Sequence, residues 1–146
     1  RDGLLANLPH GAPVGIFHGD FQIANLFYSF NHQLLAVIDW ELVGIGATLN
    51  DVGWICTFSD REAWAVGEGA RPTFLDPDRL VALYEQAWGA PLVDIGWFRA
   101  LAAYKFAVIT GFNLSLHRRG KRVDPSWEVT GLSMRPLLNR ALELVG

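Results

Sequence analysis

His18-Gly19-Asp20-Phe21-Gln22-Ile23-Ala24-Asn25-Leu26-Phe27 is the stretch of sequence that decides the fold. It follows a short apolar run, 14–17, and a second apolar run, 34–38, ends at Asp39. Two strand-like segments therefore each deliver an aspartate at their carboxyl end, and Asn25 follows the first aspartate by five residues. Phosphoryl transfer requires such side chains: a carboxylate that accepts the proton of an attacking hydroxyl, and oxygen ligands for Mg²⁺.

A β-hairpin is expected directly after this stretch. Residues 26–30 and 34–38 are apolar and strand-like, and the polar turn Asn31-His32-Gln33 separates them. Because a hairpin brings its two open ends together, we expect Asn25 and Asp39 to lie close to each other and to bind a metal ion. The alternative is a hairpin end with a structural role alone.

The composition indicates one domain with an apolar core. The chain has 146 residues, 51% of them apolar, and a net charge of −3, which is too small to suggest a nucleic-acid-binding domain. No apolar run approaches the roughly 20 residues of a membrane span, and no signal-peptide pattern opens the chain, so no membrane partner is expected. The single cysteine, Cys56, fits a reducing, cytoplasmic location and is expected to be a buried small residue.

The rest of the chain is mostly helical by its apolar periodicity. Asp76-Pro77 has the form of an N-cap followed by proline at the first helical position, and Gly89 is the expected end of that helix. Asp124-Pro125 opens the last helix by the same device, and Pro136 is expected to kink or split it. Before the first long helix, Gly44-Ile45-Gly46 is expected to break the backbone pattern.

The expected fold is therefore α+β and mostly α, with a small β element followed by a helical bundle. The expected helices cover residues 49–58, 76–89, 94–117 with Asp94 as a cap, and the segment from 124 onward, with a single helical turn at 62–66 and a loop containing Gly67, Gly69 and Pro72.

Three motifs together resemble the aminoglycoside phosphotransferase and choline kinase group of protein-kinase-like enzymes. They are His18-Gly19-Asp20 with Asn25, then Ile38-Asp39-Trp40-Glu41, then Asn50-Asp51-Val52-Gly53-Trp54. The first two motifs occur in the family's order and at its separation, 19 residues between their aspartates. The resemblance is strongest over residues 14–54.

The resemblance implies a role for each matching residue. Asp20 corresponds to the catalytic base that acts on the substrate hydroxyl. Asn25 corresponds to a Mg²⁺ ligand, and Asp39 to the aspartate that bridges the metal and the nucleotide phosphates. Asp51 resembles an aspartate that braces the catalytic loop through its backbone, and His18 is expected to be a scaffold. The implied cofactors are Mg²⁺ and ATP or GTP, and the implied partner is a small-molecule hydroxyl acceptor.

The chain also departs from the family's pattern. Kinase-like enzymes have an N-terminal lobe with a Gly-rich loop over the phosphates and a strand lysine that pairs with them. Here only 17 residues precede His18, and the two lysines, Lys105 and Lys121, lie downstream. We therefore expect residues 1–146 to be a single domain, the C-terminal lobe, with little activity in the absence of the N-terminal lobe.

Two other functions remain open from the sequence. The chain could be a stand-alone C-terminal lobe that acts as a binding or regulatory module. A metal-dependent hydrolase that uses the same carboxylates is a weaker alternative, because the His/Asp clusters of two-metal sites are absent from the sequence pattern.

For several further residues the sequence allows either a functional or a purely structural role. Glu41 could lie near the metal or the acceptor, or be a solvated loop carboxylate. The basic segment 118–122 could meet an anionic group, although a solvated charge run is the more common situation. The aromatic residues Trp97, Tyr104 and Phe112 are expected mainly in the core, where relatives also build acceptor pockets.

Overall fold

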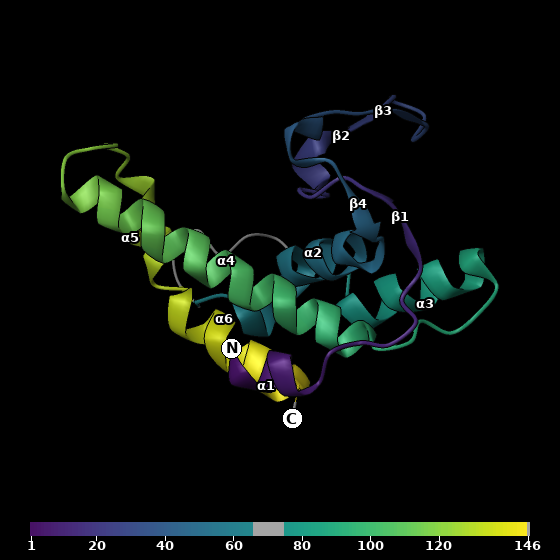
Figure 1. The fold of residues 1–146 in the computed structure, drawn as a ribbon. Coiled ribbons are helices and arrows are strands. Elements are labelled where there is room, and N and C mark those ends of the chain that lie inside the picture. The colour runs from purple at the N-terminus through teal and green to yellow at the C-terminus, as the bar shows by residue number, and fades with distance from the viewer. Residues whose placement is uncertain (66–74, 146) are drawn as a thin grey trace.

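The computed structural model describes residues 1–65 and 75–145, and it confirms an α+β fold dominated by helices. Two small two-stranded sheets lie to one side of the helices, and α4 crosses the centre of the molecule (Figure 1). The strands are β1 (Val14–Phe17), β2 (Leu26–Tyr28), β3 (Leu34–Val37) and β4 (Gly44–Ala47). The α-helices are α1 (Asp2–Ala6), α2 (Leu49–Ser59), α3 (Pro77–Trp88), α4 (Ile95–Arg118), α5 (Ser126–Gly131) and α6 (Met134–Val145). Single 3-10 turns are η1 (Ile23–Asn25), η2 (Trp40–Leu42) and η3 (Arg61–Ala63).

The expected hairpin is confirmed as the antiparallel pair β2–β3, in which Leu26 is opposite Val37. Its strands are shorter than expected because the turn already begins at Ser29. The backbone N–H of Ser29 donates to the carbonyl of Gln33 at 2.9 Å, and the N–H of His32 donates back to the carbonyl of Ser29 at 3.0 Å.

The expected break at Gly44-Ile45-Gly46 was wrong, since these residues form β4, which pairs with β1 in antiparallel register. Glycine leaves space there for a neighbouring side chain. A Cβ added to Gly44 would lie 2.6 Å from the Phe17 ring, which covers this part of the strand. The two glycines that suggested a break in the chain therefore belong to a strand, and they leave space for the ring of Phe17.

The helix ends follow the local signals with two differences. Asp76 caps α3 through the N–H groups of Asp78 and Arg79, and Gly89 ends the helix with φ of 82°. Asp94 occupies the N-cap position of α4, but its side chain makes no capping hydrogen bond to the helix. The second difference is at Asp124-Pro125, where the prediction was wrong: Pro125 is the N-cap residue and the helix begins at Ser126. The last helix is split at residues 132–133, and Pro136 lies in the first turn of α6, where its missing N–H costs little.

The segment after α2 is described only in part. A helical turn is present there, but it is the 3-10 turn η3 and begins at Arg61, one residue before the expected turn at 62–66. Val66 and the expected loop residues Gly67, Gly69 and Pro72 lie outside the described residues.

The core is built around α4, which packs against both α2 and α6 (Figure 1). One buried cluster gathers small residues of α4 with Leu137 and Ala141 of α6, and another joins Leu49, Val52 and Cys56 of α2 to Phe98 of α4. The core prediction is confirmed for Cys56. Among the aromatic residues of α4, Trp97 and Tyr104 pack against the core, whereas the prediction was wrong for Phe112, which is 64% exposed.

Buried charges join α4 and α6 to the end of α2. Asp60, which is 5% exposed, forms ion pairs with Arg99 of α4 at 3.6 Å and with Arg140 of α6 at 2.8 Å. Arg140 also pairs with Glu62 at 3.0 Å. These pairs hold the end of α2 against the two helices that build most of the core.

Candidate active site

The loop between β1 and η1 is fixed to helix α2 by one carboxylate. Asp51, in the first turn of α2, accepts the backbone N–H of His18 at 2.6 Å and that of Gly19 at 2.9 Å. Charge-assisted bonds of this kind are about twice as strong as neutral ones. The expected bracing role of Asp51 is therefore confirmed by its contacts.

His18 ties the same loop to the end of β3. The N–H of Asp20 donates to His18 Nδ1 at 3.2 Å, so the ring proton is on Nε2, which donates to the carbonyl of Ile38 at 2.7 Å. The ring is 2% exposed and packs against Trp40 with the centroids 4.6 Å apart. His18 thus links the Asp20 loop to the segment that carries Asp39, and its scaffold role is confirmed.

Gly19 allows the tight turn between these two residues. Its φ of 88° is left-handed, and an added Cβ would collide with the carbonyl oxygen of Leu42 and lie 2.8 Å from its Cβ. The loop and η2 therefore approach each other more closely than any side chain at position 19 permits.

The carboxylate of Asp20 is held by three neutral side chains. Trp54 Nε1 donates to Oδ1 at 2.7 Å, and Gln22 Nε2 lies 3.0 Å from Oδ1 and 2.9 Å from Oδ2. Asn25 Nδ2 donates to Oδ2 at 3.1 Å and to the backbone carbonyl of Asp20 at 2.9 Å. A carboxylate has about four acceptor positions, and these four contacts occupy them and fix its orientation. Two of the four contacts come from the single amide nitrogen of Gln22.

Two of these donors, Gln22 and Trp54, were missed as site residues in the sequence. Trp54 follows Asp51 by three residues on α2, so both side chains lie on one face of the helix. That spacing was a usable signal once Asp51 was placed beside the loop.

The hairpin brings Asn25 and Asp39 to its open end, as expected. The N–H of Ile38 donates to the carbonyl of Asn25 at 3.0 Å, one residue before Asp39. Asp39 is exposed and has a left-handed backbone with φ of 66°, which aspartate tolerates better than most residues. In the described part of the chain, its carboxylate and Asn25 Oδ1 accept no hydrogen bond from the protein.

The side-chain oxygen atoms of Asn25 and Asp39 are suitable ligands for Mg²⁺. They belong to an amide and a carboxylate, both hard ligands, and Mg²⁺ is commonly held by one or two protein ligands together with substrate phosphates. Among residues 1–65 and 75–145, no group of three or more His, Cys, Asp or Glu side chains is arranged to hold a metal by itself.

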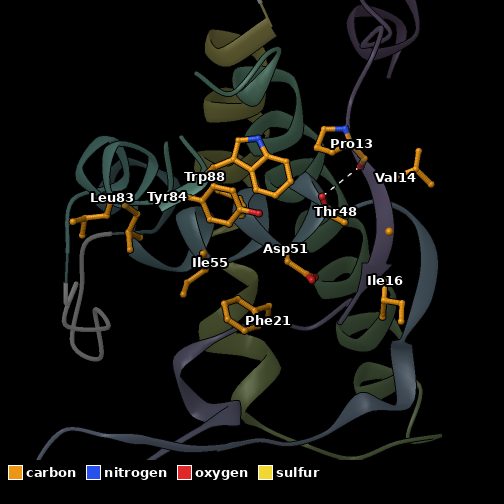
Figure 2. A pocket seen from close by; sticks show the side chains of 13 residues that line it. Pro13, Val14, Ile16, Phe21, Thr48, Asp51, Ile55, Leu83, Tyr84 and Trp88 are labelled. Atoms are coloured by element: carbon orange, nitrogen blue, oxygen red, sulfur yellow. Dashed lines mark hydrogen bonds between the residues drawn. The ribbon is translucent and has the colours of Figure 1, made fainter. Parts of the chain in front are cut away.

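Asp51 also lines a groove of about 660 Å³ between β1, α2 and α3 (Figure 2). Its walls are apolar and aromatic, with Asp51 and Thr48 as polar groups. Phe21, next to Asp20 in the chain, forms one end of the groove, and Tyr84 and Trp88 of α3 lie across from it. Aromatic and aliphatic walls with few polar groups are typical of small-molecule sites.

Within the residues that the structure describes, the remaining candidate charges form no hydrogen bond or ion pair with the predicted base or metal ligands, although Glu41 follows Asp39 by two residues. Arg118 of the basic segment pairs with Glu128 through two bonds of 2.8 Å, which raise the pKa of the Arg118 guanidinium and lower the pKa of the Glu128 carboxyl. Glu41 is exposed on η2. None of the described helices is both long enough and apolar enough to cross a membrane.

Comparison with known proteins identifies the family. The profile of the phosphotransferase enzyme family (APH) matches residues 2–104. The crystal structure of a candidate aminoglycoside phosphotransferase from Ralstonia eutropha JMP134 superposes with a TM-score of 0.80 at 26% identity, over 99% of this chain and 46% of that one.

Curated relatives are much longer than this chain. Probable acyl-CoA dehydrogenase IBR3 of Arabidopsis thaliana is 32% identical over 128 residues, which cover 70% of this chain and 15% of the relative. Acyl-CoA dehydrogenase family member 11 of Gallus gallus is 28% identical over 153 residues, which cover 97% of this chain and 20% of the relative. The chain thus spans a fifth or less of these two relatives and under half of the solved structure. With more than half of its length matched by the family profile, the chain belongs to the phosphotransferase enzyme family and has the kinase-like fold of an aminoglycoside phosphotransferase.

Proposed function

We propose that the polypeptide containing this chain transfers the γ-phosphoryl group of ATP or GTP to a hydroxyl of a small molecule. One observation carries the proposal: the Asp20 carboxylate is held in a single orientation by Trp54, Gln22 and Asn25. Asn25 is in turn joined through the hairpin to the segment carrying Asp39. A base and two oxygen ligands are thereby built into one short loop and one hairpin.

In this mechanism Asp20 positions the acceptor and receives its proton. The acceptor hydroxyl takes one of the two positions that the Gln22 amide occupies in this structure, and it donates to the carboxylate at roughly 2.6–3.2 Å, as for a general base. Its oxygen forms a bond to the γ-phosphorus, the bond to the bridging oxygen of the nucleotide breaks, and the nucleoside diphosphate leaves with that oxygen. The proton passes to Asp20, so that charge and atoms balance.

Asn25 Oδ1 and the Asp39 carboxylate are the groups that would hold Mg²⁺. When bound, the metal neutralises the charge of the nucleotide phosphates. Asn25 has a double role in this arrangement, because its amide nitrogen orients Asp20 at 3.1 Å while its oxygen is available as a ligand.

The proposal includes a separate nucleotide-binding lobe. Strand and hairpin residues expose large apolar side chains, a surface that such a lobe would cover. They are Val14, Ile16, Phe30, Leu34, Leu35, Ile38 and Ile45. We propose that the 146 residues alone are inactive or nearly so, and that the protein works in the cytoplasm, where ATP and GTP are available.

The charges of this chain argue against a polycationic acceptor. Apart from Asp20, Asp39 and Asp51, which already have roles in the site, three carboxylates on η2 and after α2 come into question: Glu41, Asp60 and Glu62. Asp60 is buried in ion pairs and Glu62 pairs with Arg140, which leaves Glu41 of these three. We therefore propose a neutral or anionic hydroxyl compound, such as a sugar or a hydroxyacyl compound, in preference to an aminoglycoside.

The test uses the complete gene product that contains this chain. Phosphoryl transfer from Mg–ATP is measured over a panel of hydroxyl acceptors that spans cationic, neutral and anionic compounds. Asp20→Asn should lower transfer by about 10² to 10⁴, whereas the matched surface variant Asp2→Asn should not, because Asp2 is exposed in the first turn of α1. Retained transfer in Asp20→Asn removes Asp20 as the base, and turnover by residues 1–146 alone contradicts the separate lobe.

A further inference from the structure

Lys105 of α4 reaches the loop that carries Asp20 from a distant part of the sequence. Its Nζ lies 4.3 Å from the centroid of the Trp54 ring and 3.4 Å from the carbonyl oxygen of Gly19. Gly19 directly precedes Asp20, and Trp54 donates to its carboxylate. Lys105 therefore contacts two groups next to Asp20: the backbone carbonyl of Gly19 and the side chain of Trp54.

The surroundings of the ammonium group are unusual for a lysine. Although part of the side chain is exposed, loss of hydration lowers the pKa of the Lys105 ammonium, while the carboxylates of Asp20 and Asp51 act in the opposite direction. A cation gives up hydration at a cost that specific contacts must offset. Here the contacts are an indole face and a carbonyl oxygen, and the negative charges of Asp20 and Asp51 add a favourable electrostatic interaction.

The Trp54 ring is packed between other aromatic rings, so its orientation between Lys105 and Asp20 is fixed. Its ring packs edge-to-face on Phe58 with the centroids 5.5 Å apart, and on Phe106 at 5.8 Å. A cation over the face of an indole draws electron density from the ring, and this polarisation makes the ring N–H a stronger donor. The N–H concerned is the one that donates to Asp20 Oδ1 at 2.7 Å.

We propose that Lys105 is a positioning residue for Asp20, acting through the indole of Trp54 and the carbonyl of Gly19. The proposal rests on the proposed function only in taking Asp20 as the base. Lys105 does not itself transfer a proton. Lys105 strengthens the hydrogen bond from Trp54 that orients the Asp20 carboxylate, and it holds the carbonyl of Gly19, the residue before Asp20.

The first arm of the test reads the Trp54 indole directly. In the ¹⁵N-labelled full chain, the Trp54 indole N–H resonance is assigned by its loss in Trp54→Phe. Lys105→Met should shift this resonance towards the position of a weaker hydrogen bond and speed its exchange with solvent, whereas Lys105→Arg, which keeps a cation over the ring, should leave it near the parent position. Lys121→Met is the matched control, since Lys121 is the other lysine of the chain and is exposed.

The second arm measures turnover of the complete gene product with Mg–ATP and water as the acceptor. Lys105→Met should lower kcat by roughly 5- to 30-fold with little change in the KM for ATP, and Lys105→Arg should restore most of it. Circular dichroism verifies that each variant is folded, and Lys105→Gln replaces Lys105→Met if the latter is not.

The two arms separate this proposal from the proposed function. An unchanged Trp54 resonance in the folded Lys105→Met variant overturns the positioning role, as does an equal loss in Lys105→Arg and Lys105→Met. If Asp20→Asn keeps full turnover, the base role fails, and the Trp54 resonance alone then decides whether Lys105 positions the carboxylate.

Discussion

Asp51 joins helix α2 to the loop that carries Asp20, because its carboxylate accepts the backbone N–H of His18 at 2.6 Å. The second bond, from Gly19 at 2.9 Å, makes this single side chain the acceptor for two consecutive N–H groups of a buried loop. Helix and loop therefore keep one relative position, and Trp54, one turn along the same helix, is placed to donate to Asp20.

Loss of the Asp51 carboxylate should destabilise the whole domain. Asp51→Ala leaves two buried N–H groups unpaired, and each costs about 1–3 kcal/mol, so we expect a loss of about 2–6 kcal/mol in the free energy of unfolding. Asp51→Asn keeps one acceptor oxygen and should lose less. Urea denaturation followed by circular dichroism measures both, with Glu41→Gln as the surface control, and a loss below about 0.5 kcal/mol in Asp51→Ala would contradict the bracing role.

A side chain at position 19 should be harmful for two separable reasons. Gly19→Ala introduces both a left-handed alanine, at about 1–2 kcal/mol, and a collision with Leu42. Gly11→Ala is the matched control, because Gly11 has a similar φ of 84° but an added Cβ there meets no atom within 4 Å. Thermal unfolding should show a clearly larger loss for Gly19→Ala than for Gly11→Ala, and equal losses would mean that the contact with Leu42 relaxes without cost.

The parts of the site that could be predicted from the sequence depend on local geometry. The hairpin closes across a few residues, so turn chemistry and apolar alternation are enough to bring Asn25 and Asp39 together. The N-cap of α3 is equally local, because Asp76 accepts N–H groups two and three residues ahead.

The parts that were missed depend on contacts between distant segments. β4 pairs with β1 across about thirty residues, and its glycines are explained only by the ring of Phe17. Lys105 meets Gly19 across 86 residues of sequence, and no pattern in α4 indicates which of its faces lies over the loop. Such contacts follow from how α4 crosses α2, and periodicity alone does not contain that information.

The crossing of α2 and α4 leads to a third prediction, at Gly53. A Cβ at this position would collide with the carbonyl oxygen of Phe98 and lie 2.6 Å from the carbonyl carbon, so the two helix backbones are in contact there. Alanine in a helix interior is normally better than glycine by about 1 kcal/mol. Gly53→Ala should instead lower stability by about 1–3 kcal/mol, since the helices must separate.

Gly3 of α1 provides the comparison for Gly53. An added Cβ at Gly3 makes only an ordinary contact of 3.8 Å with Val145. Gly3→Ala should therefore be neutral or slightly stabilising in the same urea titration. If Gly53→Ala behaves in the same way, the close contact between α2 and α4 does not limit the side chain at that position.

The last prediction concerns the pH dependence of stability through Cys56. Burial raises the pKa of the Cys56 thiol from its ordinary value of 9.0 to about 12, partly opposed by the charge of Arg99. Above pH 9 the unfolded thiol ionises while the folded thiol stays protonated, so unfolding releases a proton and becomes more favourable as pH rises. The stability present below pH 9 is therefore lost progressively as pH approaches 12.

Comparison with Cys56→Ala isolates this contribution from the other groups that titrate in the same range. Between pH 8 and pH 10 the parent chain should lose about 1.4 kcal/mol more unfolding free energy than Cys56→Ala, which has no thiol to ionise. A thiol reagent at pH 8 should label Cys56 slowly in the folded chain and rapidly in urea, because the sulfur is fully buried. Parallel pH profiles for the two proteins, or fast labelling of the folded chain, would show that the thiol is accessible to water.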